Sequence, residues 1–170
     1  MMVRLLGAAL VAAGAAWLGF RAAAALSTRA RALEEMAQGL ALLEQELELD
    51  GPPLPQLMER LEGGTRGPAK ALFRDCRRAL DELERESFSQ AWERLVRSRE
   101  ELGREGRGAL LSLGETLGRC DCGEQRRAVS RVRKRLTELA RRTEEERRRQ
   151  GKVYQVLGLS GGAFLIILLL

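Results

Sequence analysis

The chain has 170 residues, of which 29 are Lys or Arg and 24 are Asp or Glu, giving a formal net charge of +5 at pH 7. It has no histidine, so it lacks the residue used most often as a general base and as a metal ligand. Aromatic residues make up 4% of the chain and there are four prolines, a composition that favours long helices over sheets. We therefore expect an all-α protein that is not an enzyme.

An apolar stretch lies near the N-terminus. It covers residues 5–20, and after Arg21 a run of alanines extends it to Leu26. With Arg21 reaching back to the headgroups, about 22 residues are available, close to the number that crosses a bilayer. The sequence therefore predicts a transmembrane helix over residues 1–26. A cleaved signal peptide is the alternative, because Arg4 precedes the apolar run and small residues follow it.

A second apolar stretch covers residues 153–170 and predicts a transmembrane helix over residues 152–170. Basic residues gather on the inner flanks of the two stretches: Arg21, Arg29, Arg31, Arg141, Arg142, Arg147, Arg148, Arg149 and Lys152. The positive-inside rule then places residues 27–151 in the cytoplasm, as a domain held at the cell membrane by both ends. Anionic lipid or an acidic partner is a second explanation for these cations.

The segment between the two apolar stretches predicts a bundle of about six helices. Five apolar residues step by three and four along the first helix, residues 28–49: Leu33, Met36, Leu40, Leu43 and Leu47. Further helices are expected over residues 54–61, 68–85, 108–118 and 121–150, and one that begins after a capping box at Ser87–Gln90. Residues 103–106 are expected to be a loop. Short connections favour an antiparallel bundle between two terminal transmembrane helices.

The three cysteines give little sign of chemistry. Cys76 falls on the apolar stripe of its predicted helix, where a packed core thiol is expected. Cys120 and Cys122 flank Asp121, but a structural zinc site takes four ligands and the chain has no histidine. We therefore expect no catalytic residues, no cofactor and no metal site. Arg alternates with Glu along most of the predicted bundle, which is typical of a solvated surface, so no nucleic-acid partner is expected.

Several short motifs occur in an order that resembles a known family. Residues 5–10 spell LLGAAL, and residues 31–47 form a Leu-rich helix that ends in Leu-Glu-Gln-Glu-Leu. Ala91-Trp92, the GETLG motif at residues 114–118 and GKVY at residues 151–154 follow. In order, spacing and total length the chain resembles stage III sporulation protein AB of endospore-forming bacteria.

The resemblance implies a role in endospore formation. Members of that family belong to a channel complex between the mother cell and the forespore. Their cytoplasmic domain is similar to platform protein F of type II secretion and type IV pilus systems. By that analogy the chain would be a platform in the mother-cell membrane that contacts other proteins of the complex, including a secretion-type ATPase.

The resemblance also indicates a candidate interaction surface at and after the GETLG motif: Gly114, Glu115, Thr116, Gly118, Asp121 and Gln125. A second explanation for Gly114 and Gly118 is helix packing and a helix C-cap. An alternative function also remains open: a membrane-tethered coiled-coil scaffold or regulator that forms homo-oligomers through the stripe between Leu33 and Leu47.

Overall fold

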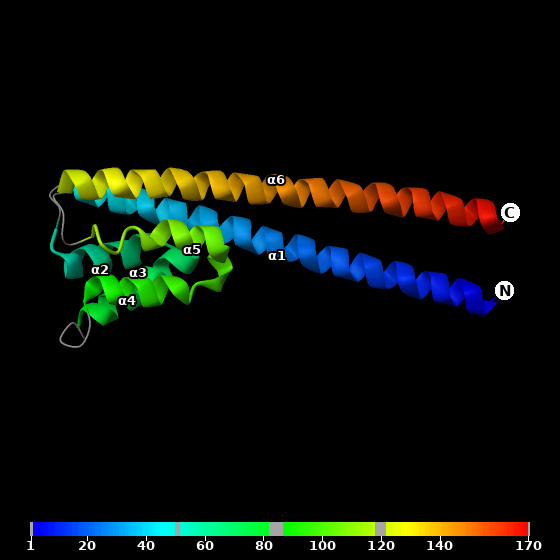
Figure 1. Ribbon diagram of the computed structural model, residues 1–170, viewed down its shortest axis with the longest axis horizontal. Helices are drawn as coiled ribbons and strands as arrows, with labels where there is room; N and C mark the ends of the chain where they lie inside the picture. Colours follow the sequence, from blue (N-terminus) through cyan, green and yellow to red (C-terminus); the bar gives the residue numbers. More distant parts are fainter. Residues whose placement is uncertain (1, 50–51, 82–86, 118–121, 170) are drawn as a thin grey trace. The chain divides into compact units, whose positions relative to one another are not determined.

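The computed structural model describes the backbone of residues 2–49, 52–81, 87–117 and 122–169, and most side chains between residues 21 and 149. The described elements are all helical (Figure 1). They are α1 (Met2–Leu49), α2 (Leu54–Gly64), α3 (Gly67–Leu80), α4 (Phe88–Arg97), the 3₁₀ helix η1 (Glu100–Leu102), α5 (Gly103–Leu111) and α6 (Cys122–Leu169). The all-α prediction is confirmed, with six α-helices and no strand in the part of the chain that is described.

The chain divides into two compact units. One consists of residues 29–141 and contains α2 to α5 with the second half of α1 and the first half of α6. The other consists of residues 1–28 and 142–170, the terminal parts of α1 and α6. The backbone of α6 is helical through Gly151.

The two predicted membrane anchors, residues 1–26 and 152–170, are helical where the backbone is described, but most of their side chains lie outside the description. Within the described residues, no helix combines the length and the apolar character needed to cross a membrane.

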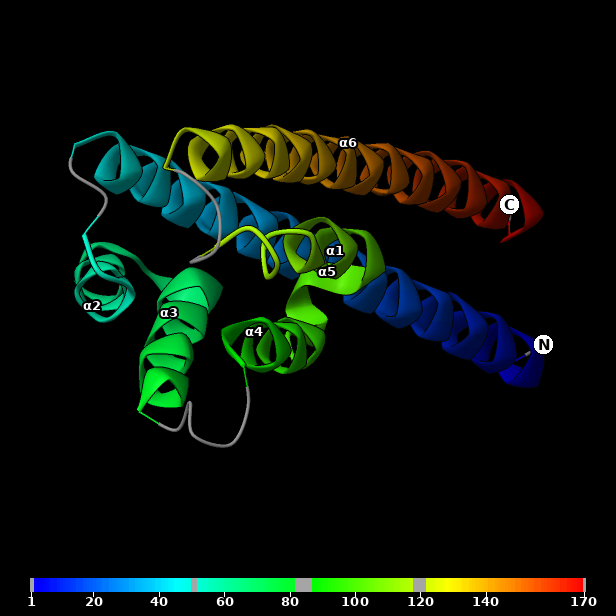
Figure 2. The ribbon, with the colours of Figure 1, turned by 60° about the vertical axis from the view of Figure 1, so that its left-hand side comes forward.

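The core of the 29–141 unit forms around the apolar stripe of α1. Leu33, Met36, Leu40, Leu43 and Leu47 are all buried, as their spacing predicted. Figures 1 and 2 show α2 to α5 gathered beside this cyan part of α1, and their own apolar residues complete the same cluster. The stripe is therefore covered within one chain, which contradicts the idea of an exposed seam for a second copy.

Helices α1 and α6 run antiparallel within this unit. Arg133 of α6 pairs with Glu44 of α1 at 2.8 Å, and Arg126 pairs with Glu48 at 2.9 Å. The numbers rise along α6 as they fall along α1, so the two helices point in opposite directions. Four apolar residues of α6 are buried in the core of the unit: Val129, Val132, Leu136 and Leu139.

The short helices begin largely where their local signals place them. At α4, Ser87 accepts a hydrogen bond from the Gln90 amide, and the Gln90 side chain accepts one from the Ser87 amide, which confirms the capping box. Pro68 lies in the first turn of α3, as its fixed φ favours. That helix ends at Leu80, before the predicted end at residue 85, and residues 82–86 lie outside the description.

Helix α5 differs most from the prediction. Residues 103–106, expected to be a loop, form its first turn, and the helix ends at Leu111 instead of continuing to residue 118. Gly106 is buried, and a β-carbon there would lie 2.6 Å from Cδ2 of Leu33. Gly103 has φ +65°, and a β-carbon there would meet the Arg29 guanidinium at 2.1 Å. These glycines allow α5 to pack closely on α1. The helix therefore begins at Gly103 because of a contact with a distant part of the chain, which the local sequence does not reveal.

Candidate functional site

The three cysteines offer no nucleophile in the described part of the structure. Cys76 is buried on α3, and desolvation together with the neighbouring Asp75 carboxylate raises the pKa of its thiol to about 12. The thiol is therefore protonated and unreactive near neutral pH. No group of three metal-ligating side chains occurs among the described residues, while Cys120 and the side chain of Cys122 lie outside them.

The segment 109–117 is held by Trp92. The Trp92 side chain is fully buried, and its indole Nε1–H donates a hydrogen bond to the Leu110 carbonyl at 2.8 Å. The Phe88 ring lies beside it, with ring centroids 6.1 Å apart. A buried indole needs such a partner for its N–H group, so the contact fixes the end of α5 against α4.

The GETLG motif begins in a series of turns, which corrects the expectation that it is helical. Amides of Leu113, Gly114, Thr116 and Leu117 donate to carbonyls three or four residues earlier, at 2.9–3.2 Å. Leu113 and Leu117 point into the core and are buried. The chain is therefore wound tightly around the buried Trp92 and does not continue α5.

Gly114 belongs to the core and not to a surface. It is buried, and a β-carbon there would lie 2.8 Å from Cδ1 of Trp92. This contact supports the packing explanation that the sequence left open for Gly114, and it removes the residue from the candidate interaction surface.

The other predicted site residues separate into three groups. Glu115 is exposed, and Thr116 is half-buried at the edge of a groove. Gln125 is half-buried on α6. It lies about one helical turn before Ala128, which lines the same groove. Gly118 and Asp121 lie outside the described residues, so the C-cap proposed for Gly118 and the place of Asp121 in the candidate surface remain predictions.

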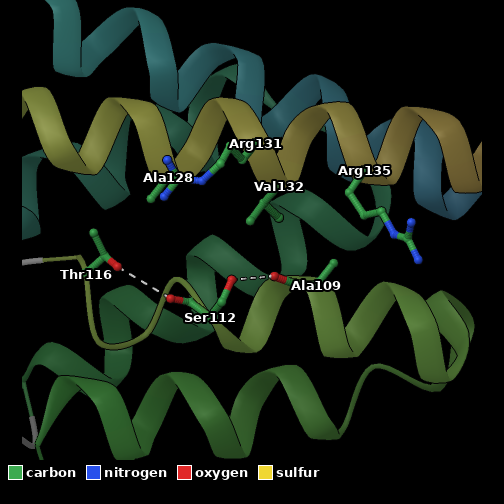
Figure 3. A pocket seen from close by; sticks show the side chains of 7 residues that line it. All are labelled: Ala109, Ser112, Thr116, Ala128, Arg131, Val132 and Arg135. Carbon is green, nitrogen blue, oxygen red and sulfur yellow. Dashed lines mark hydrogen bonds between the residues drawn. The ribbon is translucent and has the colours of Figure 1, made fainter.

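The groove lies between α6 and the outer side of the 109–117 segment, with a volume of about 260 Å³. Figure 3 shows α6 along one wall and the end of α5 with the following turn along the other. Its lining consists of Ala109, Ser112, Thr116, Ala128, Arg131, Val132 and Arg135. The four α6 residues fall at positions i, i+3, i+4 and i+7, so they share one face of that helix.

The groove is apolar at its base and polar at its rim. Ala109, Ala128 and Val132 supply the apolar part. The Ser112 hydroxyl donates to the Ala109 carbonyl at 2.9 Å, and the Thr116 hydroxyl donates to the Ser112 carbonyl at 3.4 Å (Figure 3). Each hydroxyl oxygen keeps lone pairs that can accept a hydrogen bond from a ligand.

Two arginines of the rim were not among the predicted site residues. Arg131 and Arg135 are both exposed on α6. Arg135 lies 3.7 Å from the Glu105 carboxylate, whereas Arg131 forms no ion pair with a described residue. Their i, i+4 spacing was visible in the sequence, but the surplus of arginine was assigned only to the membrane flanks.

Comparison with known proteins agrees with this fold. The sequence profile of a family described as stage III sporulation protein AB matches residues 4–170. The chain is 26% identical to stage III sporulation protein AB of Bacillus subtilis (strain 168) over 172 residues, which cover 99% of this chain and all of that protein.

A solved structure of stage III sporulation protein AB shares the fold. It has a TM-score of 0.61 and 22% sequence identity, and the match covers 71% of this chain and 97% of the solved chain. The profile extends over nearly the whole sequence and the fold is the same, so this chain belongs to the stage III sporulation protein AB family.

Proposed function

We propose that this chain is a structural component of the channel complex between the mother cell and the forespore, and that its helical unit is a platform for a secretion-type ATPase. The observation that carries the proposal is the family match over residues 4–170. The 29–141 unit adds a physical basis, because it combines a well-packed core with an open groove.

The proposal includes anchoring in the mother-cell membrane by both ends. The apolar stretches at residues 5–20 and 153–170 support it, and so do the basic residues between them. Residues 27–151 would then form the cytoplasmic domain, between anchors at residues 1–26 and 152–170. Extraction of sporulating-cell membranes with alkaline carbonate tests this part, since an integral protein stays in the pellet and a peripheral one is released.

The direct experiment uses the full chain in lipid nanodiscs and the purified sporulation ATPase of the same organism. We expect saturable binding by biolayer interferometry, with light scattering used to count the copies of this chain. Absence of binding at 100 μM ATPase, about the limit of weak specific contacts, would contradict the platform function.

Self-association remains the alternative function, and the structure narrows how it could occur. The α1 stripe is buried within the chain, so a homo-oligomer would need another surface in the 29–141 unit. A stable homodimer that does not bind the ATPase would favour a membrane-tethered scaffold over the platform.

A further inference from the structure

One face of α6 carries cations that have no partner within the described structure. Arg127, Arg131 and Lys134 are exposed and fall at positions i, i+4 and i+7. None of the three forms a hydrogen bond or ion pair with another described residue. We call these three residues the α6 ridge. Three like charges on one face repel each other, which is unfavourable for the isolated helix.

The neighbouring cations of α6 are used differently. Arg126 and Arg133 pair with Glu48 and Glu44 of α1, and Arg135 lies near Glu105 of α5. Residues 124–141 contain seven basic and two acidic side chains, and residues 29–49 of α1 contain two basic and five acidic ones. The carboxylates of α1 therefore neutralise the inner side of α6 and leave the ridge uncompensated.

The ridge lies along one edge of the groove described above. Arg131 belongs to both, since it lines the groove beside Val132 (Figure 3) and lies between Arg127 and Lys134 in the sequence of α6. A ligand seated in the groove would meet an apolar base, hydroxyl oxygens of Ser112 and Thr116 on one rim, and the cations on the other. This combination fits a helix with small apolar residues on one side and carboxylates next to them.

We propose that the groove and the α6 ridge together dock an acidic amphipathic helix of a partner protein. The carboxylates of that helix would lie at i and i+4, opposite Arg127 and Arg131, and an Ala, Val or Leu side chain would enter between Ala109 and Val132. The proposal rests on the proposed function, because it assigns the docking face and the partner's chemistry to the platform.

One physical feature favours a protein helix over a lipid surface. The site is concave, and a helix can insert a side chain between its two walls, whereas a flat bilayer meets mainly the rim.

The test compares two charge-reversal variants of the full chain in nanodiscs of neutral lipid. The first is Arg127→Glu/Arg131→Glu, and the matched control, with the same change in net charge, is Lys70→Glu/Arg78→Glu on the exposed side of α3. The probes are the sporulation ATPase and a labelled 20-residue Ala/Leu helix with Glu at i, i+4, i+7 and i+11. We expect the ridge variant to bind either probe about 30-fold more weakly and to lose most of the salt dependence, whereas the control binds like the wild type.

A second variant tests the groove without changing any charge. Ser112 is exposed at the rim, so Ser112→Trp adds a large side chain that blocks the groove. Binding of both probes should fall about tenfold, while the circular dichroism spectrum and the melting temperature stay unchanged. Equal binding by this variant and the wild type would overturn the groove as the docking site.

The outcomes separate the two proposals. ATPase binding that the ridge and groove variants do not change would overturn this inference and leave the platform function standing. Ridge-dependent binding of the acidic helix without any ATPase binding would support the docking surface and contradict the ATPase as the partner. Ridge-dependent binding to phosphatidylglycerol vesicles, with neither probe bound, would overturn the inference in favour of a lipid contact.

Discussion

The segment 109–117 has two sides that differ in how fully they are used. Its inner side faces the core with Leu110, Leu113, Gly114 and Leu117, which are all buried, and it contacts Trp92 through Leu110 and Gly114. Its outer side presents Ala109, Ser112 and Thr116 to a groove that nothing in the described chain fills. Substitutions on the inner side should therefore change stability, and substitutions on the outer side and the α6 ridge should change binding alone.

The largest expected effect is at Trp92. Trp92→Ala removes a fully buried indole and its hydrogen bond to the Leu110 carbonyl, so we expect a loss of about 3–5 kcal/mol in the free energy of unfolding. Urea unfolding of the chain in micelles, followed by circular dichroism, measures it. Leu95→Ala on the same helix is the control, because Leu95 is only partly buried and should cost clearly less.

A pair of glycine substitutions should differ in sign. Gly114→Ala places a β-carbon 2.8 Å from the Trp92 ring, and we expect a loss of about 1–3 kcal/mol from overpacking. Gly108→Ala on α5 meets nothing within 4 Å and should stabilise the helix by up to about 1 kcal/mol. Equal effects of the two changes in thermal unfolding would contradict the close packing of Gly114 on Trp92.

Two neighbouring arginines of α6 should also behave differently. Arg133 pairs with Glu44 in a partly buried position, so Arg133→Ala should cost about 0.5–1 kcal/mol of stability. Arg131 lacks a partner among the described residues, and Arg131→Ala should leave stability within about 0.5 kcal/mol while weakening partner binding. A destabilisation by Arg131→Ala as large as that by Arg133→Ala would show that the ridge belongs to the fold.

The smallest effect at neutral pH concerns Cys76. Burial raises the pKa of its thiol from 9.0 to about 12, so the folded state prefers the protonated form. The contribution to stability is complete below pH 9 and is lost as the pH rises from 9 towards 12. In a Cys120→Ser/Cys122→Ser background, urea unfolding at pH 8 and pH 10.5 should show this loss, and adding Cys76→Ala should remove it.

Sequence periodicity predicted the core of the 29–141 unit well. The buried stripe from Leu33 to Leu47 was confirmed. Five apolar residues spaced by three and four lie on one face of a helix, and that face is the one expected to be buried. The capping box at Ser87 was confirmed for a similar reason, since its signal is complete within four residues. Both features depend on local chemistry that a single sequence contains.

The region after residue 103 could not be predicted in this way. Gly106 and Gly114 look like helix breakers in a sequence, but each is needed where a partner distant in the chain, Leu33 or Trp92, comes close. The docking surface was missed for a related reason. Arg131 differs from Arg133 only in whether a carboxylate of α1 lies opposite, and that pairing is set by the antiparallel contact of α1 with α6.

The central claim is that partners meet the outer side of the 109–117 segment. The most direct measurement places the photo-crosslinker p-benzoylphenylalanine at the exposed Glu115, beside the groove, or at Lys70 of the full chain in nanodiscs with the purified sporulation ATPase. If the claim holds, position 115 forms a covalent adduct with the ATPase that the acidic helix competes away, and position 70 forms none. Adducts of equal yield from both positions, or from position 70 alone, would contradict it.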